Sequence, residues 1–489
     1  MKRISVFTSA FLVLLTNFVL ADWPQFRGQN SAGVAGKASV PTEFGPGKHE
    51  LWSLPLGSGH SSPCVVGNSI FLTTFDRAER RLEVLRISRD RGEIRWRRHV
   101  PTNRIETGHP SFNPASSTPA SDGERVVAYF GSFGLICFDM DGEKLWEIKM
   151  PLPKSYAGNA TSPAIIGDRV ILYRGNHVDH FILAVDKATG KQIWKVRQEE
   201  PFASELACTA CPIVADGKLI VHGARSVQAL DLSNGKQIWV AKCATTATST
   251  PILAGKEVIV AAWNKMGEPA LRPEFPSFDK LVSDHDKDND QLISEDEFPR
   301  LMIFHRPDGA EAPQNGASWR FRQSDHDRDG EISANEWATV LRQLAGFRAR
   351  YDTHGMLAIP LDSKGIVEPE RIRTLEQQGI PEVPSPLFYD GLIYFVKNGG
   401  VLTCINLKTG ERVSRVRTRG RGTHYASPII ADGKLFSVAG NGTITVMSLG
   451  AKPKILAVND IGDDTYATPA IVDGILYVRT HKKLYAFGL

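Results

Sequence analysis

The sequence predicts an all-β fold built from one repeated four-stranded sheet. Two observations carry this prediction. A pair of small or hydroxylated residues followed by Pro recurs eight times, and six of the seven intervals between successive Pro residues average about 45 residues. Each copy then continues with two short β-rich runs joined by a Gly-containing turn, as in residues 213–221. Four strands in about 45 residues is typical of one propeller blade, so eight copies predict an eight-bladed β-propeller.

The eight copies begin at Ser61-Ser62-Pro63, Ser117-Thr118-Pro119, Thr161-Ser162-Pro163, Ala210-Cys211-Pro212, Ser249-Thr250-Pro251, Pro384-Ser385-Pro386, Ala426-Ser427-Pro428 and Ala467-Thr468-Pro469. A two-sheet sandwich of unrelated strands is the alternative fold. It does not explain why the same turn residues return at one period.

The third and fourth strands of a blade are clearest in the third copy. Residues 181–185 form an apolar run, and residues 186–194 form an Asp-to-Gly turn followed by a run that contains Trp194. Asp can bond the turn backbone and Gly can adopt a positive φ, so this pattern predicts a strand, a turn and a closing strand.

The two ends of the chain complement each other. The last copy, residues 465–489, has room for three strands only, and an unassigned strand at residues 47–52 precedes the first copy. We therefore expect this N-terminal strand to complete the eighth blade. Such closure removes an exposed sheet edge.

At this point the residues carry a family resemblance. Residues 184–194 resemble the tryptophan-docking repeat of pyrroloquinoline-quinone (PQQ)-type β-propellers, and residues 229–239 are similar except for Asn234. The run Asp-Trp-Pro-Gln-Phe-Arg-Gly at 22–28 resembles the opening of exported bacterial PQQ-like repeat proteins, a group that includes the outer-membrane-assembly propeller. The resemblance implies that Trp residues pack between neighbouring blades; they are Trp96, Trp146, Trp194 and Trp239.

Composition and the first segment bear on the compartment. The 489 residues are 42% hydrophobic and 23% charged, and 58 Lys and Arg stand against 54 Asp and Glu, so no basic field indicates nucleic acid. Residues 1–21 begin with Lys2 and Arg3, continue through an apolar stretch and end in small residues, which predicts a cleaved signal peptide. An uncleaved anchor is the alternative, but polar residues interrupt the apolar run. No Cys follows the cleavage site, so we expect a periplasmic or secreted protein without stable membrane insertion.

The six cysteines are too few and too scattered for a disulfide scaffold. Cys208 and Cys211 form a C-x-x-C. Buried thiols, a local disulfide, and redox or metal chemistry are the alternatives for this pair.

The fifth interval between Pro residues is 135 residues long, about 90 more than the others. The extra residues fall between Trp263 and Met356, inside the fifth blade. We therefore divide the chain into a signal peptide (1–21), a first propeller part (22–264), an insertion (265–354) and a second propeller part (355–489).

The second acidic loop of the insertion, residues 325–336, resembles the EF-hand calcium loop at every diagnostic position. A hard cation takes six to eight oxygen ligands, and this spacing supplies them around Gly330. The expected ligands are the side chains of Asp325, Asp327 and Asp329, the carbonyl of Glu331, Ser333 through water, and both oxygens of Glu336.

The first acidic loop, residues 286–297, departs from the pattern at one position. Gln291 stands where the motif has Gly, and a non-Gly residue at positive φ costs roughly 1–2 kcal/mol, so we expect weaker binding here. Segments 278–282, 298–302, 319–322 and 337–344 are expected to be the flanking helices of a pair of hands. The expected ligands are Asp286, Asp288, Asp290, the carbonyl of Leu292, Ser294 and Glu297.

The PQQ resemblance also implies an alternative activity, a PQQ- and calcium-dependent quinoprotein dehydrogenase that oxidises alcohols or sugars. The sequence lacks the adjacent Cys-Cys of the alcohol-oxidising members, and no Asp or Glu outside the acidic loops matches their site motifs. No catalytic residue is therefore assigned. We expect an exported, calcium-binding, non-catalytic binding or scaffold protein with a protein or polysaccharide partner, and PQQ is kept only as the cofactor of the alternative.

Two groups of residues are candidates for partner contact. Loop residues before the blade Pro could fill the mouth of the channel or bind a ligand there; they are His60, Thr209, His424, Tyr425 and Tyr466. A strand would place the alternating arginines at 415, 417, 419 and 421 on one face, where they form either a solvated edge or a surface for an anionic partner such as a polysaccharide or an acidic protein.

Overall fold

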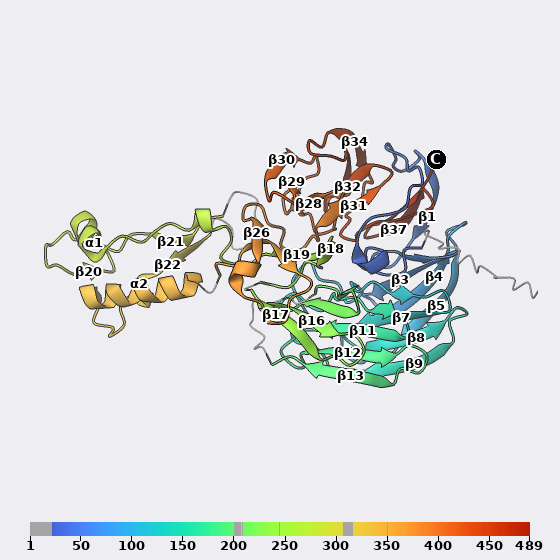
Figure 1. Cartoon of the computed structure of the whole chain (residues 1–489), viewed down its shortest axis with the longest axis horizontal. Coiled ribbons are helices and arrows are strands. Elements are labelled where there is room, and N and C mark those ends of the chain that lie inside the picture. The colour runs from blue at the N-terminus through green and yellow to red at the C-terminus, as the bar shows by residue number, and fades with distance from the viewer. Residues whose placement is uncertain (1–21, 200–206, 208, 244, 307–315, 350) are drawn as a thin grey trace, which may run out of the picture.

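The computed structural model describes residues 22–489, apart from 200–206, 208, 244, 307–315 and 350. In this part of the chain, eight sheets of four or five strands are arranged around one axis (Figure 1). The eight-bladed all-β propeller that the repeat predicts is confirmed. The predicted signal peptide lies outside the described residues.

The first four sheets hold β2 (Cys64–Val66), β3 (Ser69–Asp76), β4 (Arg81–Ser88), β5 (Ile94–Val100); β6 (Ala120–Ser121), β7 (Arg125–Phe130), β8 (Gly134–Asp139), β9 (Lys144–Lys149); β10 (Ala164–Ile166), β11 (Arg169–Arg174), β12 (Phe181–Asp186), β13 (Gln192–Arg197); and β14 (Ile213–Ala215), β15 (Lys218–His222), β16 (Ser226–Asp231), β17 (Gln237–Lys242), with β25 (Gly365–Ile366) added at the edge. The last four hold β18 (Ile252–Ala254), β19 (Glu257–Ala262), β24 (Gly355–Pro360), β26 (Arg373–Glu376); β27 (Leu387–Tyr389), β28 (Leu392–Lys397), β29 (Val401–Asn406), β30 (Arg412–Arg417); β31 (Ile429–Ala431), β32 (Lys434–Val438), β33 (Thr443–Ser448), β34 (Ile455–Asp460); and β35 (Ala470–Val472), β36 (Ile475–Arg479), β37 (Lys483–Phe487), β1 (Glu50–Pro55).

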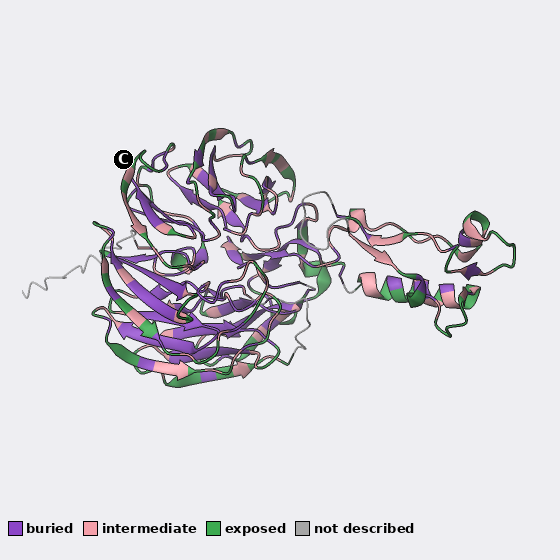
Figure 2. Cartoon of the chain, turned by 180° about the vertical axis from the view of Figure 1, so that it is seen from behind, coloured by how far each residue is buried: buried purple, intermediate pink, exposed green. Residues whose placement is uncertain are grey.

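The turns between the first two strands of a blade follow from their sequence. Asp216 and Gly217 join β14 to β15 and both have positive φ, 48° and 70°. This is the conformation that Asp-Gly hairpin turns favour. Buried residues occupy the inner strands and exposed residues lie along the outermost ones (Figure 2).

The repeated Trp residues join neighbouring blades. Trp96, Trp146, Trp194 and Trp239 are all buried. Each indole N–H donates to a backbone carbonyl of the next blade, as Trp96 does to Met140 over 2.8 Å. For Trp96, Trp146 and Trp194, the repeat glycine of the next blade lies against the indole; a Cβ on Gly190, for example, would lie 2.7 Å from Trp146 Cδ2.

Strand β1 occupies the outermost position of the eighth sheet. It pairs antiparallel with β37, with Leu54 opposite Leu484. Trp52 on β1 donates its indole N–H to the Arg89 carbonyl over 3.0 Å and lies against Gly92, as the repeat Trp residues do in other blades. That this pairing is what holds the propeller closed stays a prediction.

The segment that precedes β1 crosses the axis. Residues 22–35, here called the plug, include the short 3-10 helix η1 (Gln29–Ser31). Trp23 forms a bridge with Val65 of the first blade, the side chain of Asn30 bonds both the N–H and the C=O of Val214 in the fourth, and Val34 forms a bridge with Ile430 in the seventh. The plug therefore closes one end of the axial channel.

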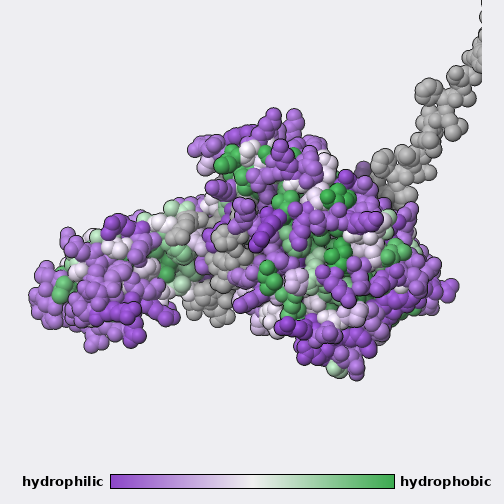
Figure 3. Space-filling view, turned by 90° about the horizontal axis from the view of Figure 1, so that it is seen from below, coloured by the Kyte–Doolittle hydropathy of each residue, from purple (hydrophilic) through white to green (hydrophobic). Residues whose placement is uncertain are grey.

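The insertion leaves the fifth sheet between β19 and β24 and projects away from the propeller (Figure 1). Its elements are η2 (Pro269–Leu271), α1 (Phe278–His285), β20 (Ile293–Ser294), β21 (Leu301–Phe304), β22 (Ala317–Trp319), η3 (Phe321–Gln323), β23 (Glu331–Ile332) and α2 (Ala334–Ala349); a further 3-10 turn, η4 (Pro369–Arg371), follows β25. Its face in Figure 3 is mostly hydrophilic.

The prediction of four helices around the acidic loops is wrong for two of the four segments. Segment 298–302 runs into strand β21, which pairs with β22, and segment 319–322 contains the end of β22 and the start of η3. The first of these segments has five residues and contains Pro299, so it makes too few intrahelical hydrogen bonds to form a stable helix on its own. A hairpin partner then satisfies its backbone. Helices α1 and α2 include the other two expected segments.

The two acidic loops meet through β20 and β23, where Ile293 lies opposite Ile332. Both side chains are fully buried and pack with Leu281 and Trp337 in a hydrophobic cluster of the insertion's own. Among the described helices, none has both the length and the apolar character needed to span a membrane.

Candidate functional site

The second acidic loop draws its carboxylates toward one point. Oxygens of Asp325, Asp327 and Glu336 lie within 4.8 Å of one another. The loop backbone fixes them: His326 N–H donates to Glu336 Oε1 over 2.9 Å, and Ser333 N–H and Oγ–H donate to Glu336 Oε2, each over 2.8 Å. Glu336 lies in the first turn of α2, so the helix sets its position.

Two buried carboxylate oxygens in this loop lack a hydrogen-bond partner among the described residues, Asp325 Oδ1 and Glu331 Oε2, and only Asp325 is an expected side-chain ligand. Asp325 Oδ1 is buried, and no hydrogen-bond donor reaches it from the described residues. A buried carboxylate oxygen without a donor costs free energy unless a cation or another group satisfies it. This orphaned oxygen fits a ligand position facing a bound metal ion.

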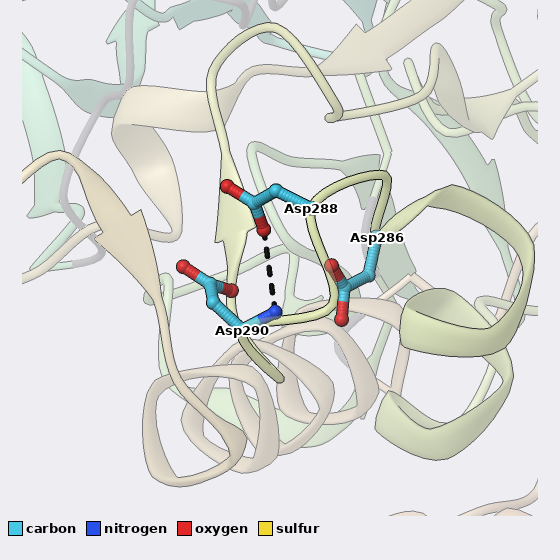
Figure 4. A group of neighbouring side chains, drawn as sticks. All are labelled: Asp286, Asp288 and Asp290. Carbon is cyan, nitrogen blue, oxygen red and sulfur yellow. Dashed lines mark hydrogen bonds between the residues drawn. The ribbon is translucent and has the colours of Figure 1, made fainter.

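The first loop has the same backbone design (Figure 4). Oxygens of Asp286, Asp288 and Asp290 lie within 4.8 Å of one another, and Asp290 N–H donates to Asp288 Oδ1 over 3.3 Å. Glu297 does not join this group. Its carboxylate accepts N–H groups of Lys287 and Ser294, over 2.7 and 2.9 Å.

The charges of the two loops interact. Backbone N–H donation from Lys287 and Ser294 lowers the pKa of Glu297 to about 2. Glu331 of the second loop has its pKa raised by desolvation and by carboxylates of the first loop, Asp290 and Glu297. A divalent cation in either loop would offset this repulsion.

Gln291 adopts the left-handed conformation that the motif requires, with φ of 70°, against 95° at Gly330. We expect Gln291→Gly to raise the calcium affinity of the first loop roughly two- to fivefold, because relief of the strain exceeds the added flexibility of glycine. Calorimetric titration of the full chain measures this. Gly330→Gln is the reciprocal control and should weaken the second loop, whereas unchanged affinity in both variants would show that backbone strain does not tune these loops.

The axial channel is a cavity of about 1530 Å³. Phe26 of the plug lines its closed end. The residue just before the blade Pro reaches this cavity in all eight blades, and we call the set the hydroxyl ring, although one member is a thiol. Its members are Ser62, Thr118, Ser162, Cys211, Thr250, Ser385, Ser427 and Thr468.

Hydrogen bonds run around the hydroxyl ring from blade to blade. The backbone N–H of each member from Ser62 to Ser427 donates to the side chain of the next member, over 2.9–3.4 Å. Between the last blade and the first, the buried Arg479 donates to the Ser61 carbonyl over 3.1 Å. The ring therefore joins all the blades at the floor of the cavity.

Four of the five predicted mouth residues line the cavity, namely His60, Thr209, Tyr425 and Tyr466. His424 does not, because it is buried within its loop, where its backbone N–H donates to Asn398 Oδ1 over 2.7 Å. His60 Nε2 lies 2.9 Å from His481 Nε2, and burial together with His481 lowers the pKa of His60 to about 3. The neutral imidazole of His60 can then form a hydrogen bond with the His481 ring.

All four alternating arginines line the cavity as well. Arg415 and Arg417 lie on β30, and Arg419 and Arg421 follow it in the loop to β31. With Lys397 they form the basic arc, and among the described residues none of the five forms an ion pair. The strand that was expected to carry all four arginines therefore carries only two.

A buried carboxyl lies between the second and third blades. Glu106 is 4% exposed, its backbone N–H donates to Ser132 Oγ over 3.0 Å, and its carboxyl lies against Gly131. Burial raises the pKa of Glu106 to about 8, against a smaller opposing effect of Arg174.

This shift makes stability depend on pH. The unfolded chain releases the proton near its ordinary pKa of 4.5 and the folded chain near 8, so the unfolding free energy falls as pH rises between these values. Relative to the native chain, Glu106→Gln should gain about 3 kcal/mol between pH 5 and pH 8. Urea denaturation of both proteins at the two pH values measures the gap, and a gap that does not widen contradicts the assignment.

Sequence reasoning missed the hydroxyl ring and the plug. A sequence pattern could have predicted the ring, because the residue before each blade Pro is Ser, Thr or Cys in all eight copies. Cys211 is a free, buried member of the ring, and burial raises the pKa of its thiol. Cys208 lies outside the described residues.

Comparisons with known proteins show which families this chain resembles. A family model described as "Outer membrane protein assembly factor BamB" matches residues 83–314. The outer membrane protein assembly factor BamB of Yersinia pestis is 27% identical over 226 residues, which are 44% of this chain and 52% of that protein. The chain is a PQQ-like β-propeller related to BamB. The match spans about half the length of this relative.

Solved structures share the fold of this PQQ-like propeller. BamB from Moraxella catarrhalis has a TM-score of 0.53 at 12% identity, over 90% of this chain and 97% of that one. A europium-containing methanol dehydrogenase has 0.57 at 11% identity, over 96% and 98%. A quinohemoprotein alcohol dehydrogenase from Comamonas testosteroni has 0.55 at 14% identity, over 96% and 80%. At sequence identities this low, the three structures show a shared fold and do not show a shared function.

Proposed function

We propose that this chain is an exported, calcium-binding PQQ-like propeller that acts as a non-catalytic binding or scaffold protein. The observation that carries the proposal is the separation of its two sites. The carboxylates that suit a cation converge in the insertion, whereas hydroxyl, aromatic and cationic side chains surround the axial cavity. Among the described cavity-lining residues, Glu268 and Glu382 are the only carboxylates. A quinone-linked oxidation needs several oxygen ligands for calcium and also a base beside the quinone. Glu268 already accepts the Gly379 N–H over 2.8 Å, so these two carboxylates are a poor match for both tasks.

Calcium is the ion that the insertion suits best. Its loops offer carboxylate, carbonyl and hydroxyl oxygens in twelve-residue spacing, and the orphaned Asp325 Oδ1 fits a hard cation. The paired loops would form one EF-hand pair in the fifth blade. Bound calcium would order this insertion, either for stability alone or for contact with a partner.

The remaining features suit an exported platform. Residues 1–21 would be removed as a signal peptide, β1 would close the propeller through β37, and residues 265–354 would form a module of their own. The partner would be a protein or a polysaccharide, in the periplasm or outside the cell. Relatedness to BamB, an assembly factor, supports a binding role.

The alternative is a PQQ- and calcium-dependent dehydrogenase acting on alcohols or sugars. Its support is the shared fold with the methanol and alcohol dehydrogenases above. Fold likeness alone does not carry a catalytic activity.

Calorimetric titration of residues 22–489 separates these functions. Calcium is titrated first, and PQQ is then titrated in saturating calcium. We expect one or two calcium events and no heat from PQQ. A stoichiometric PQQ signal at micromolar concentration would instead establish the alternative, and absence of a calcium event would overturn the role of the loops.

A further inference from the structure

We propose that the axial cavity binds an acidic oligosaccharide, with its carboxylates on the basic arc and its sugar hydroxyls on the hydroxyl ring. This inference rests on the proposed binding function and names its ligand class. It concerns the cavity, not the calcium loops.

The cavity lies on the axis of the propeller. Phe26 of the plug lines it together with the hydroxyl ring and the basic arc, so a ligand in the cavity can reach both sets of polar side chains. A volume of about 1530 Å³ accommodates several linked pyranose rings, and a concave, largely pre-formed cavity is the usual form of a small-molecule site.

The floor presents hydrogen-bond donors. Each hydroxyl oxygen that accepts an N–H from the preceding blade still has its own hydrogen to donate. Among the described residues, the Thr118, Ser385 and Ser427 hydroxyls accept such an N–H and donate no hydrogen bond of their own. A ligand rich in hydroxyl and carboxylate oxygens supplies the missing acceptors.

The basic arc is the part of the cavity wall whose charges form no ion pairs among the described residues. Arg415, Arg417, Arg419 and Arg421 are exposed, and within the described part of the chain Arg417 donates only to the Gly399 carbonyl, over 3.2 Å. Five like charges beside one cavity repel one another, and low-dielectric walls focus their field on an entering anion. Guanidinium groups bind carboxylates through paired hydrogen bonds.

Aromatic side chains favour a sugar over an acidic peptide. Tyr156 lines the cavity with 58% of its surface exposed, and its ring lies 5.5 Å from that of His109. Tyr425 and Tyr466 form a second aromatic group, with ring centroids 5.4 Å apart. Flat rings beside cations suit the C–H faces and the carboxylates of a uronic acid chain.

The test uses a galacturonate hexamer titrated into the chain without residues 1–21, at low salt. Arg419→Ala with Arg421→Ala should weaken binding roughly tenfold, because two carboxylate partners are lost. Arg91→Ala with Arg371→Ala removes the same charge from exposed sites outside the cavity and should leave binding unchanged. Higher salt should weaken the native complex.

Two further arms identify the ligand class. Tyr156→Ala, at an exposed position, should weaken hexamer binding by severalfold, and a fully methyl-esterified hexamer should bind at least tenfold more weakly than the acid. Failure of the hexamer to bind, or equal losses in both arginine pairs, would overturn the proposal. Binding of hexaglutamate or PQQ in place of the hexamer would also overturn it, assigning the cavity to an acidic peptide or to the quinone. Calcium titration of the same samples reports the proposed loop function independently.

Discussion

Glu336→Gln is expected to lower the calcium affinity of the second loop by on the order of 100-fold, because the loop loses its bidentate ligand and one negative charge. The native carboxylate uses both oxygens to hold the loop, accepting from His326 through Oε1 and from Ser333 through Oε2. An amide has only one acceptor oxygen, so the variant also loses one of these contacts. Calorimetric titration in calcium-depleted buffer resolves the weakened event from that of the first loop.

Glu331→Gln is the matched control for this prediction. It makes the same chemical change in the same loop, but Glu331 is expected to offer the ion only its backbone carbonyl. We expect less than about a fivefold change, from altered charge alone. If both variants lose affinity equally, net charge governs binding and the bidentate assignment of Glu336 is wrong.

The propeller could be predicted from the sequence because its signals are local and repeated. Asp-Gly turns such as 216–217 fix the first hairpin of a blade, and the repeat Trp marks the strand that contacts the next blade. Each copy repeats the same turn and strand pattern, so a weak pattern in one blade does not change the assignment of the other blades. The sequence also indicated which carboxylates of the acidic loops lie close together, and the structure groups three of them in each loop; that these groups bind calcium stays a prediction.

Other features depend on contacts between distant residues and could not be predicted. The plug binds Val214 through Asn30, 184 residues away, and nothing in residues 22–35 points to that partner. The basic arc faces the cavity because the β30–β31 loop turns toward the axis beyond Arg417, which strand periodicity does not reveal. Segment 298–302 was assigned as a helix by analogy with the motif, and its pairing with β22 overrides that analogy.

Trp23→Ala is expected to destabilise the propeller by about 3–5 kcal/mol, the usual cost of truncating a fully buried Trp. Trp23 is 2% exposed, and its backbone exchanges two hydrogen bonds of 2.8 Å with Val65. Its indole packs on Gly28, where a Cβ would lie 2.8 Å from Cδ2. Truncation leaves a void between the plug and the first blade that the closed sheets cannot fill, and urea denaturation followed by circular dichroism measures the loss.

Trp23→Phe separates packing from simple loss of the native residue. The indole N–H has no acceptor among the described residues, so phenylalanine removes an unsatisfied buried donor while keeping most of the apolar contact. Its cost should stay below about 1.5 kcal/mol. If neither substitution destabilises the propeller, the ring of Trp23 does not pack into the cooperative core. A plug that unfolds apart from the blades could not serve as a fixed floor for the axial cavity.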